Sequence, residues 1–353
     1  MAKKPNNIIV GLDLGTTKVC AIVGEVKDAG QVDIIGIGIS PSNGLSKGVV
    51  VNIDRTVESI KKAVKEAELM SGVQINSVFV GISGDHIKGT ESKGVAAIKS
   101  REVGQADVAR AIDTASSINI PGTQRILHIL PQEFVIDDLD GIKEPLGMSG
   151  TRLDVKVHII TGAETAIQNI IKSCSRAGLH VNDVVLQPLA SSRAVLTTEE
   201  QEIGVCVVDI GGGTTDMALF RDGSLCYTGV IPVGGNHVTS DITVGLRTPS
   251  TEAEKIKIKH GCAMASLVRH EDTLEVPTTG GRPPRFLSRQ ILCEIIEPRV
   301  AELFELVQQR LRSTGSEDLI ASGVVLTGGT ALMEGIQDAA EKYLGMPVRR
   351  GTP

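Results

Sequence analysis

The sequence contains no uninterrupted apolar run of about 18 residues, the length that a helix needs to cross a bilayer. Its N-terminus, MAKKPNN, has two lysines, but no apolar run long enough for a signal peptide follows them. These absences predict a cytoplasmic protein in which no segment spans a membrane.

An excess of basic charge is also missing, because the formal net charge of the 353 residues is −6. This balance argues against nucleic acid as a partner. The six cysteines form no C-x-x-C pair and no cluster with histidine at metal-ligand spacing. We interpret them as small buried residues in a reducing compartment. A chain of this length predicts two domains or one large two-lobed domain.

A glycine-rich stretch at 204–223 is typical of two strands, 205–209 and 217–220, joined by a turn. Glycines allow backbone N–H groups to converge on one point and form a nest for an anion. Asp209 could hold a magnesium ion through its waters, and Asp216 is a second carboxylate of the same hairpin. An ordinary hairpin with a loose loop is the alternative. The turn consists of Gly211, Gly212, Gly213, Thr214 and Thr215.

Residues 8–24 repeat this layout near the N-terminus. The repeated element is an Asp-x-Gly followed by two threonines, so two similar hairpins occur in the two halves of the chain. Two such hairpins facing each other across a cleft can bind a polyphosphate from both sides. The turn residues are Asp13, Gly15, Thr16, Thr17 and Lys18.

Two further loops of the chain also contain paired glycines, each at a junction that leads into a predicted helix. In the stretch 322–335, a β-rich run meets Gly328 and Gly329 before a helical pattern, and in 232–241 Gly234 and Gly235 precede a predicted helix. A strand–glycine–helix junction lets a ligand approach the backbone closely at a helix N-terminus.

The order of these four loops resembles that of the actin-like ATPases. The chain is more specifically similar to the FtsA family of bacterial cell division proteins, from about residue 8 to its end. The stretches that carry this resemblance are VCVVDIGGGTTD, VIPVGGNHVTSDI, GGRPPRFLSRQ, EIIEPR and GVVLTGGTALMEG.

The resemblance implies an α/β fold, the actin-like (ribonuclease H-like) two-lobed ATPase fold with an inserted small α+β subdomain called 1C or SHS2-like. We expect the lobe one core (1A) at 1–84 and 161–200, and the insert at 85–160. Lobe two should comprise a core (2A) at 201–245 and 314–353 and an outer subdomain (2B) at 246–313.

Apolar periodicity predicts the main helices and strands. Asp54 is expected to cap a helix that ends near Met70, and Pro298 to kink or divide the helical pattern 288–313. The other predicted helices are 105–117, 163–177 and 251–260. The predicted strands are 32–39, 78–82, 94–99, 125–136, 153–160 and 181–186, with a hairpin at 274–284.

The resemblance implies that ATP and Mg²⁺ bind between the two threonine-containing loops, with Asp13 and Asp209 facing the metal. Gln187 is the candidate for positioning the attacking water. A glutamine orients water less strongly than a carboxylate, so hydrolysis should be slow. The alternative is an ordinary polar residue at a strand end. Glu254 and Lys257 are expected at the ribose and base, unless they form only a solvated surface pair.

The family resemblance also implies partners. The C-terminal peptide of FtsZ should bind the outer subdomain, where Arg285, Arg289 and Arg299 are candidates; alternatively these arginines are solvated or pair with nearby glutamates. Head-to-tail filaments and contacts with later division proteins should use the insert. Membrane contact at midcell should depend on a C-terminal amphipathic helix, which family members carry beyond the last residue of this chain.

Two other functions are compatible with the sequence. One is an actin-fold enzyme, either a sugar kinase or an active ATPase, although the insert has no obvious Asp-centred loop for an acceptor. The other is an actin-like adaptor of pilus assembly, which also carries a 1C-like insert. The stretches GGRPPRFLSRQ and EIIEPR favour cell division.

Overall fold

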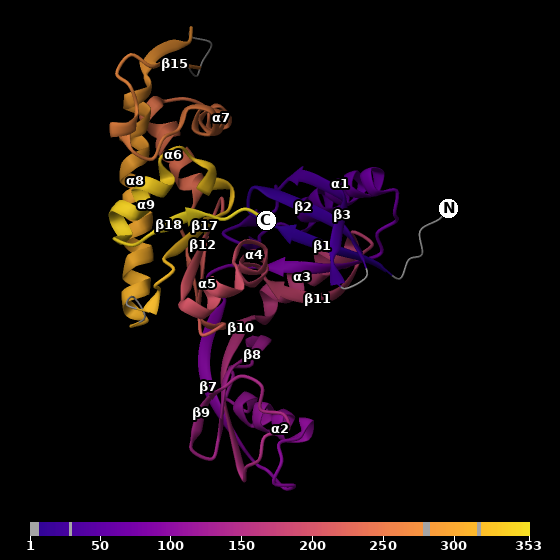
Figure 1. Cartoon of the computed structure of the whole chain (residues 1–353). Coiled ribbons are helices and arrows are strands. Elements are labelled where there is room, and N and C mark those ends of the chain that lie inside the picture. The colour runs from indigo at the N-terminus through magenta and orange to yellow at the C-terminus, as the bar shows by residue number, and fades with distance from the viewer. Residues whose placement is uncertain (1–6, 28–29, 278–282, 316–318) are drawn as a thin grey trace.

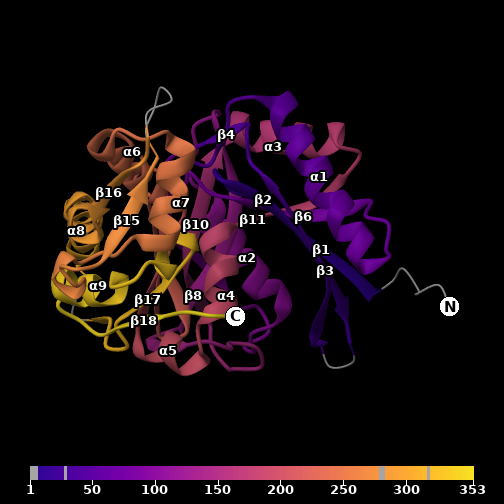
Figure 2. The same cartoon turned by 90° about the horizontal axis from the view of Figure 1, so that it is seen from above.

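The computed structural model describes residues 7–27, 30–277, 283–315 and 319–353. Figure 1 shows two α/β lobes beside each other and a smaller unit that projects from them. Lobe one contains the N-terminal strands, lobe two contains most of the C-terminal half, and the projecting unit is an insert within lobe one. The view from above in Figure 2 shows the two lobes side by side.

Lobe one is built on a five-stranded mixed sheet with the order β11-β6-β1-β2-β3. Helices α1 (Ile53–Ser71) and α3 (Glu164–Arg176) pack on this sheet and on each other. The buried face of α1 carries Val57, Ile60 and Val64, as its helical periodicity predicts. The strands are β1 (Ile8–Leu14), β2 (Lys18–Val26), β3 (Val32–Pro41), β6 (Ser77–Ile82) and β11 (His180–Leu186).

The insert contains a four-stranded antiparallel sheet with the order β7-β10-β8-β9, covered by α2 (Gln105–Ser116). It has a core of its own, in which Ala111 and Ala115 of the helix meet Val155 and Val157 of the sheet. The strands are β7 (Lys88–Ala97), β8 (Gln124–Ile136), β9 (Leu139–Ile142) and β10 (Arg152–Ala163).

Lobe two is built on a second five-stranded sheet with the order β14-β13-β12-β17-β18. Its strands are β12 (Val205–Ile210), β13 (Thr215–Arg221), β14 (Ser224–Ile231), β17 (Val324–Thr327) and β18 (Val348–Arg350). The surrounding helices are α6 (Gly235–Leu246), α7 (Ser250–His260), α8 (Arg289–Ser313) and α9 (Ile336–Leu344). A small hairpin of β15 (Thr273–Val276) and β16 (Arg285–Ser288) precedes α8.

The remaining elements are short. They are β4 (Leu45–Ser46), β5 (Val49–Val50), α4 (Gln187–Val195), α5 (Thr198–Ile203) and two 3-10 helices at Ala265–Leu267 and Gly329–Leu332. One apolar cluster extends across both lobes, since Val205, Val207 and Val325 of lobe two join the core of lobe one. The lobes therefore share buried apolar surface.

Most predicted elements are present, but four predictions of local structure were wrong in whole or in part. Asn52 caps α1, because its side chain accepts from the backbone N–H of Arg55, whereas Asp54 is already inside the first turn. The helical pattern is not divided at Pro298, because α8 continues through it and Ile296 and Val300 on either side pack into the same core; the kink, the other predicted outcome, stays a prediction. The turn of the predicted 274–284 hairpin includes residues outside the described ranges.

The third error concerns the strand predicted at 94–99. This strand, β7, begins at Lys88 and ends at Ala97. Its polar first half is part of the strand because it pairs with β10, where Lys88 lies opposite Thr161. The fourth concerns the junction after β17. Only a 3-10 turn follows Gly328, and the α-helix begins at Ile336. Of the six cysteines, Cys226 is half-buried and the other five are buried.

Candidate functional site

The first threonine-containing loop is the tight turn between β1 and β2. These strands pair in register up to Leu14 and Val19, and the N–H of Gly15 donates to the carbonyl of Lys18 at 3.0 Å. A Cβ on Gly15 would lie 2.9 Å from that carbonyl oxygen. The turn therefore requires glycine at this position, and it places Asp13 at the end of β1 beside the loop.

The second loop joins β12 and β13 in the same manner. The N–H of Gly211 donates to the carbonyl of Thr214 at 2.9 Å, and Asp209 pairs across the hairpin with Asp216. Gly328 at the end of β17 lies against this hairpin with φ +89, and a Cβ there would be 2.4 Å from Oδ1 of Asp209. Glycine at this position is required both by the left-handed backbone and by the space.

The two loops face each other across the cleft and touch. A Cβ on Gly212 would lie 2.3 Å from Cγ2 of Thr17, and one on Gly213 would lie 2.8 Å from Oγ1 of Thr16. Gly48, which belongs to none of the sequence motifs, also contacts the first loop, because its N–H donates to Oγ1 of Thr16 at 3.2 Å. In the sequence, Gly48 directly follows the turn-rich segment 41–47, and this is the signal that could have pointed to it.

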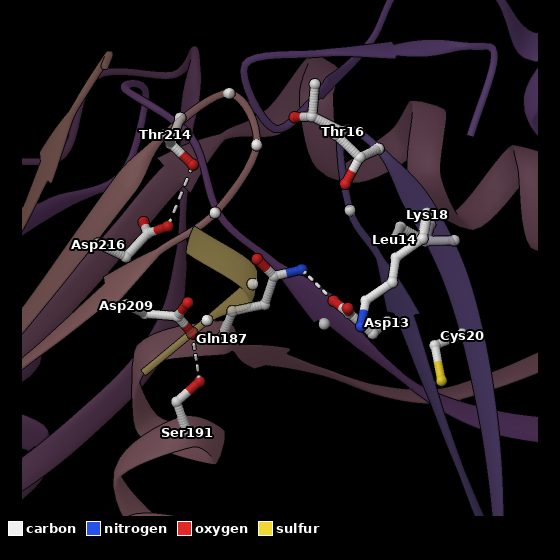
Figure 3. A pocket seen from close by; sticks show the side chains of 18 of the residues that line it. Asp13, Leu14, Thr16, Lys18, Cys20, Gln187, Ser191, Asp209, Thr214 and Asp216 are labelled. Carbon is white, nitrogen blue, oxygen red and sulfur yellow. Dashed lines mark hydrogen bonds between the residues drawn. The ribbon is translucent and has the colours of Figure 1, made fainter. Parts of the chain in front are cut away.

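A cavity of about 730 Å³ opens between the lobes at this contact. Figure 3 shows side chains from both lobes pointing into it. With one exception, every residue predicted for the metal, the phosphates, the attacking water or the adenosine lines the cavity. The exception is Gly234, which packs beneath the second loop, where a Cβ would lie 2.7 Å from the carbonyl oxygen of Gly211.

Besides Glu254, three aspartate carboxyl groups line this cavity: Asp13, Asp209 and Asp216. Burial, with the negative charge of Asp209 nearby, raises the pKa of Asp13 to about 6. Burial likewise raises the pKa of Asp216 to about 7 and raises that of Asp209. Loss of water disfavours the charged form of each group, and close like charges add to this effect. A cation placed among them would stabilise all three carboxylates.

Side chains of helix α4 hold two of these carboxyl groups, those of Asp13 and Asp209, in place. Gln187, the first residue of α4, donates from Nε2 to Oδ1 of Asp13 at 2.7 Å, and Ser191 on the same helix donates to Oδ2 of Asp209 at 2.7 Å. Both hydrogen bonds are visible in Figure 3. Helix α4 thus connects a carboxylate of lobe one with a carboxylate of lobe two.

No group of three or more His, Cys, Asp or Glu side chains with the geometry to hold a metal occurs within the described ranges. Mg²⁺ commonly keeps several waters and uses one or two carboxylates together with substrate phosphates. Asp13 and Asp209, on opposite sides of the cavity, fit that mode of binding.

On the far side of the second loop, Lys257 and Glu254 of α7 form an ion pair at 2.7 Å. The ammonium of Lys257 also donates to the carbonyl of Gly235 at 3.1 Å and to Oγ1 of Thr239 at 3.0 Å. Lys257 is buried, whereas the Glu254 side chain is 38% exposed, so the pair is shielded from solvent at its lysine end only. Ile258, Leu332 and Met333 add apolar surface here that the sequence analysis did not identify.

Comparison with known proteins gives one consistent result. Residues 206–353 match the family profile described as "Cell division protein FtsA", and residues 84–161 match "SHS2 domain inserted in FTSA". A Pseudomonas aeruginosa relative described as "Cell division protein FtsA" is 55% identical over 346 residues, which cover 98% of this chain and 83% of the relative. The chain belongs to the FtsA family.

Other FtsA relatives agree with this assignment. The Escherichia coli K12 protein is 46% identical over 353 residues, with 98% of this chain and 84% of the relative covered. The Bacillus subtilis protein is 40% identical over 350 residues, with coverages of 99% and 79%. This FtsA-family chain is therefore a cell division protein of the actin-like class, as its sequence motifs predicted.

Solved structures of more distant proteins confirm the actin-like ATPase fold. The "PilM-PilN type IV pilus biogenesis complex" matches with a TM-score of 0.67 at 17% identity, covering 97% of this chain and 87% of the other. "MreB5 of Spiroplasma citri bound to ADP" matches with a TM-score of 0.59 at 15% identity and coverages of 99% and 93%. At these identities the similarity concerns the fold alone.

No helix in the described part of this FtsA-family chain is long and apolar enough to cross a membrane.

The three arginines proposed for partner binding lie away from the cavity and make contacts within the chain. Arg285 donates to the carbonyl of Leu246, and Arg289 pairs with Glu334. Arg299 forms a two-pronged pair with Asp241 of α6, with Nε–Oδ2 and Nη2–Oδ1 distances of 2.7 and 3.0 Å. The pairing alternative thus holds for Arg299, which also pairs with Glu302.

Proposed function

We propose that this chain binds ATP with Mg²⁺ in the cavity between its lobes. The observation that carries the proposal is the contact of the two glycine–threonine loops, where Gly212 and Gly213 approach Thr17 and Thr16 more closely than any Cβ would allow. Loops of this kind direct backbone N–H groups and hydroxyls at one point, where a polyphosphate would receive donors from both lobes.

Further features of the cavity support this ligand. Asp13 and Asp209 are suited to hold Mg²⁺ through its waters, and bound phosphates would complete its octahedral shell. Lys257 and Glu254 line the cavity beside the apolar surface of Ile258, Leu332 and Met333, and their polar groups suit the hydroxyl groups of a ribose. Two solved relatives of the same fold carry the titles "bound to ADP" and "bound to AMPPNP".

Calorimetric titration of ATP with Mg²⁺ tests the proposal. The variant Thr214→Ala removes one hydroxyl donor from the second loop and should weaken binding about 10- to 100-fold, the cost of a hydrogen bond to a charged group. Thr243→Ala is the matched control, because its hydroxyl donates to the carbonyl of Thr239 within helix α6. Equal affinities in parent and Thr214→Ala would exclude Thr214 from the site.

We propose that hydrolysis, where it occurs, is slow. Gln187 uses its amide nitrogen on Asp13, which leaves the amide oxygen on the other side to orient a water (Figure 3). An amide cannot remove a proton as a carboxylate can. Phosphate release measured with a panel of sugars separates this function from that of a sugar kinase, because only a kinase would consume ATP in proportion to an acceptor.

We further propose that the chain acts in division as a nucleotide-dependent adaptor. Membership of the FtsA family supports a role in which it polymerises, binds the C-terminal peptide of FtsZ on the outer subdomain at 246–313, and recruits later division proteins through the insert. This role places it at the cytoplasmic face of the membrane at midcell. Arg285, Arg289 and Arg299 remain the proposed peptide contacts, since each keeps part of its surface exposed.

A further inference from the structure

One side-chain hydrogen bond crosses from lobe one to lobe two directly behind the phosphate loops. The hydroxyl of Ser83, the residue after β6, donates to Oδ1 of Asp216 on β13 at 2.6 Å. Both residues are buried, with exposed fractions of 3% and 6%. The other carboxyl oxygen of Asp216 accepts from the hydroxyl of Thr214 at 3.2 Å (Figure 3). A single carboxyl group therefore joins the second phosphate loop to the opposite lobe.

Ser83 is also the point from which the chain enters the insert. Gly84 follows in a left-handed conformation with φ +128, and a Cβ on Gly48 would lie 2.8 Å from the carbonyl oxygen of Ser83. Two residues later, Nδ1 of His86 accepts from the backbone N–H of Ala163, the last residue of β10. His86 thus connects the segment just before β7, where the chain enters the insert, with the end of β10, where it leaves.

The insert makes its other polar contacts with lobe two on β14. Gln132 donates to the carbonyl of Leu225 at 2.8 Å, and Nε2 of His158 lies 3.3 Å from Oγ1 of Thr228. Strand β14 is the neighbour of β13, where Asp216 pairs with Val230. The insert, lobe one and lobe two therefore form a closed ring of contacts, and the Ser83–Asp216 bond is the part of that ring beside the phosphate loop.

We propose that Ser83 and Asp216 are positioning residues that couple occupancy of the phosphate loop at Thr214 to the placement of the insert. The inference rests on the proposed binding of ATP. A threonine hydroxyl has one proton to donate. When Thr214 donates it to a phosphate oxygen, Asp216 loses that donor, and its carboxyl group depends on Ser83 alone. The hydrogen bond between Ser83 and Asp216 then strengthens. Because the chain enters the insert directly after Ser83, strand β7 moves with it toward lobe two.

Amide hydrogen exchange, with and without saturating ATP analogue and Mg²⁺, measures this coupling. In the parent, nucleotide should change the exchange of the insert strands β7 and β8 as well as that of the phosphate loops. In Ser83→Ala the loops should still respond, whereas the response of the insert should be lost. The affinity should also fall by about tenfold, because a smaller fraction of the molecules has the closed arrangement that binds.

Two further variants separate this role from a merely structural one. Ser83→Thr keeps the hydroxyl and should restore the response of the insert. Ser173→Ala removes a buried serine hydroxyl that donates to the carbonyl of Asn169 within α3, and it should behave as the parent does. If Ser83→Ala does not fold, Ser83→Cys takes its place, because a thiol is a much weaker donor of similar shape.

The outcomes distinguish the two proposals. A parent that binds ATP but shows no response in the insert would overturn the coupling and leave the proposed function intact. The same conclusion follows if Ser83→Ala, saturated with nucleotide, responds in β7 and β8 as the parent does. A parent that binds no ATP would overturn the proposed function, and this inference would fall with it.

Discussion

At the scale of a single residue, the carboxyl group of Asp13 lowers the stability of the folded chain when it is charged in the cleft. It is half-buried between a glycine turn and Gln187, and burial raises its pKa to about 6 from an ordinary value near 3.8. The folded state therefore holds a proton on Asp13 between about pH 4 and pH 6, where the unfolded chain has already released it. The unfolding free energy consequently falls as the pH rises through that interval.

The variant Asp13→Asn should remove this loss while it keeps an oxygen that accepts from Gln187. Without nucleotide and Mg²⁺, we expect it to exceed the parent in unfolding free energy by about 1–2 kcal/mol above pH 6, less than the full shift implies because Asp13 is not fully buried. Near pH 4 the difference should vanish. Urea unfolding at several pH values measures it, and equal pH slopes in the two proteins would contradict it.

Asp113→Asn serves as the control, because Asp113 is exposed on α2 and should change neither stability nor its pH dependence. In a calorimetric titration with ATP and Mg²⁺, Asp13→Asn should bind weakly despite its higher stability. Buried charged groups at a binding site commonly lower the stability of the protein while they are needed for its function.

At the scale of elements, helices α6 and α8 are joined by Arg299 and Asp241. Both side chains are about a quarter exposed, and the two-pronged geometry is the stronger form of an Arg–carboxylate pair. Arg299→Glu would therefore place a carboxylate against Asp241, so any loss of peptide binding in this variant could arise from damage to the helix pair. A test of Arg299 must therefore keep a charge pair between the two helices.

A charge exchange, Arg299→Asp together with Asp241→Arg, should retain the helix pair and move the guanidinium to α6. We expect each single variant to lower the unfolding free energy by about 1–3 kcal/mol, and the double variant to recover much of that loss. If Arg299 contacts the FtsZ peptide, fluorescence anisotropy should show weaker peptide binding by the folded double variant with ATP binding unchanged. Parent-like peptide affinity would exclude Arg299.

At the scale of the whole molecule, the insert has its own sheet and core and contacts both lobes. We expect it to form one side of a head-to-tail contact, which is heterologous and therefore propagates into a filament. The insert begins and ends at nearly the same place, because Lys88 at the start of β7 pairs with Thr161 near the end of β10. A short linker between residues 84 and 160 can therefore replace residues 85–159.

The variant without residues 85–159 should fold but should form no filaments with ATP and Mg²⁺. Pelleting and electron microscopy measure the polymer, while circular dichroism and calorimetry check the fold and the nucleotide site. The parent chain under the same conditions is the control. Filaments of unchanged form from a folded deletion variant would show that the insert has no part in the contact.

The sequence alone determined the local parts of this protein. The turns at 15–18 and 211–214 require glycine for backbone reasons that are visible in a few consecutive residues, and each turn follows a strand whose last residue but one is aspartate. Amphipathic spacing also predicted helices such as α1 and α2 to within a residue or two. Such features depend on neighbouring residues, so a single sequence contains their causes.

The tertiary structure decided which distant groups meet. Gly48 touches Thr16, Ser83 reaches Asp216 over 133 positions, and Arg299 pairs with Asp241 over 58. No local pattern specifies these partners, because each contact depends on how two sheets and an insert pack together. The same reason explains the continuous α8: Pro298 disfavours a helix locally, but the core that packs on both sides of it keeps the helix intact.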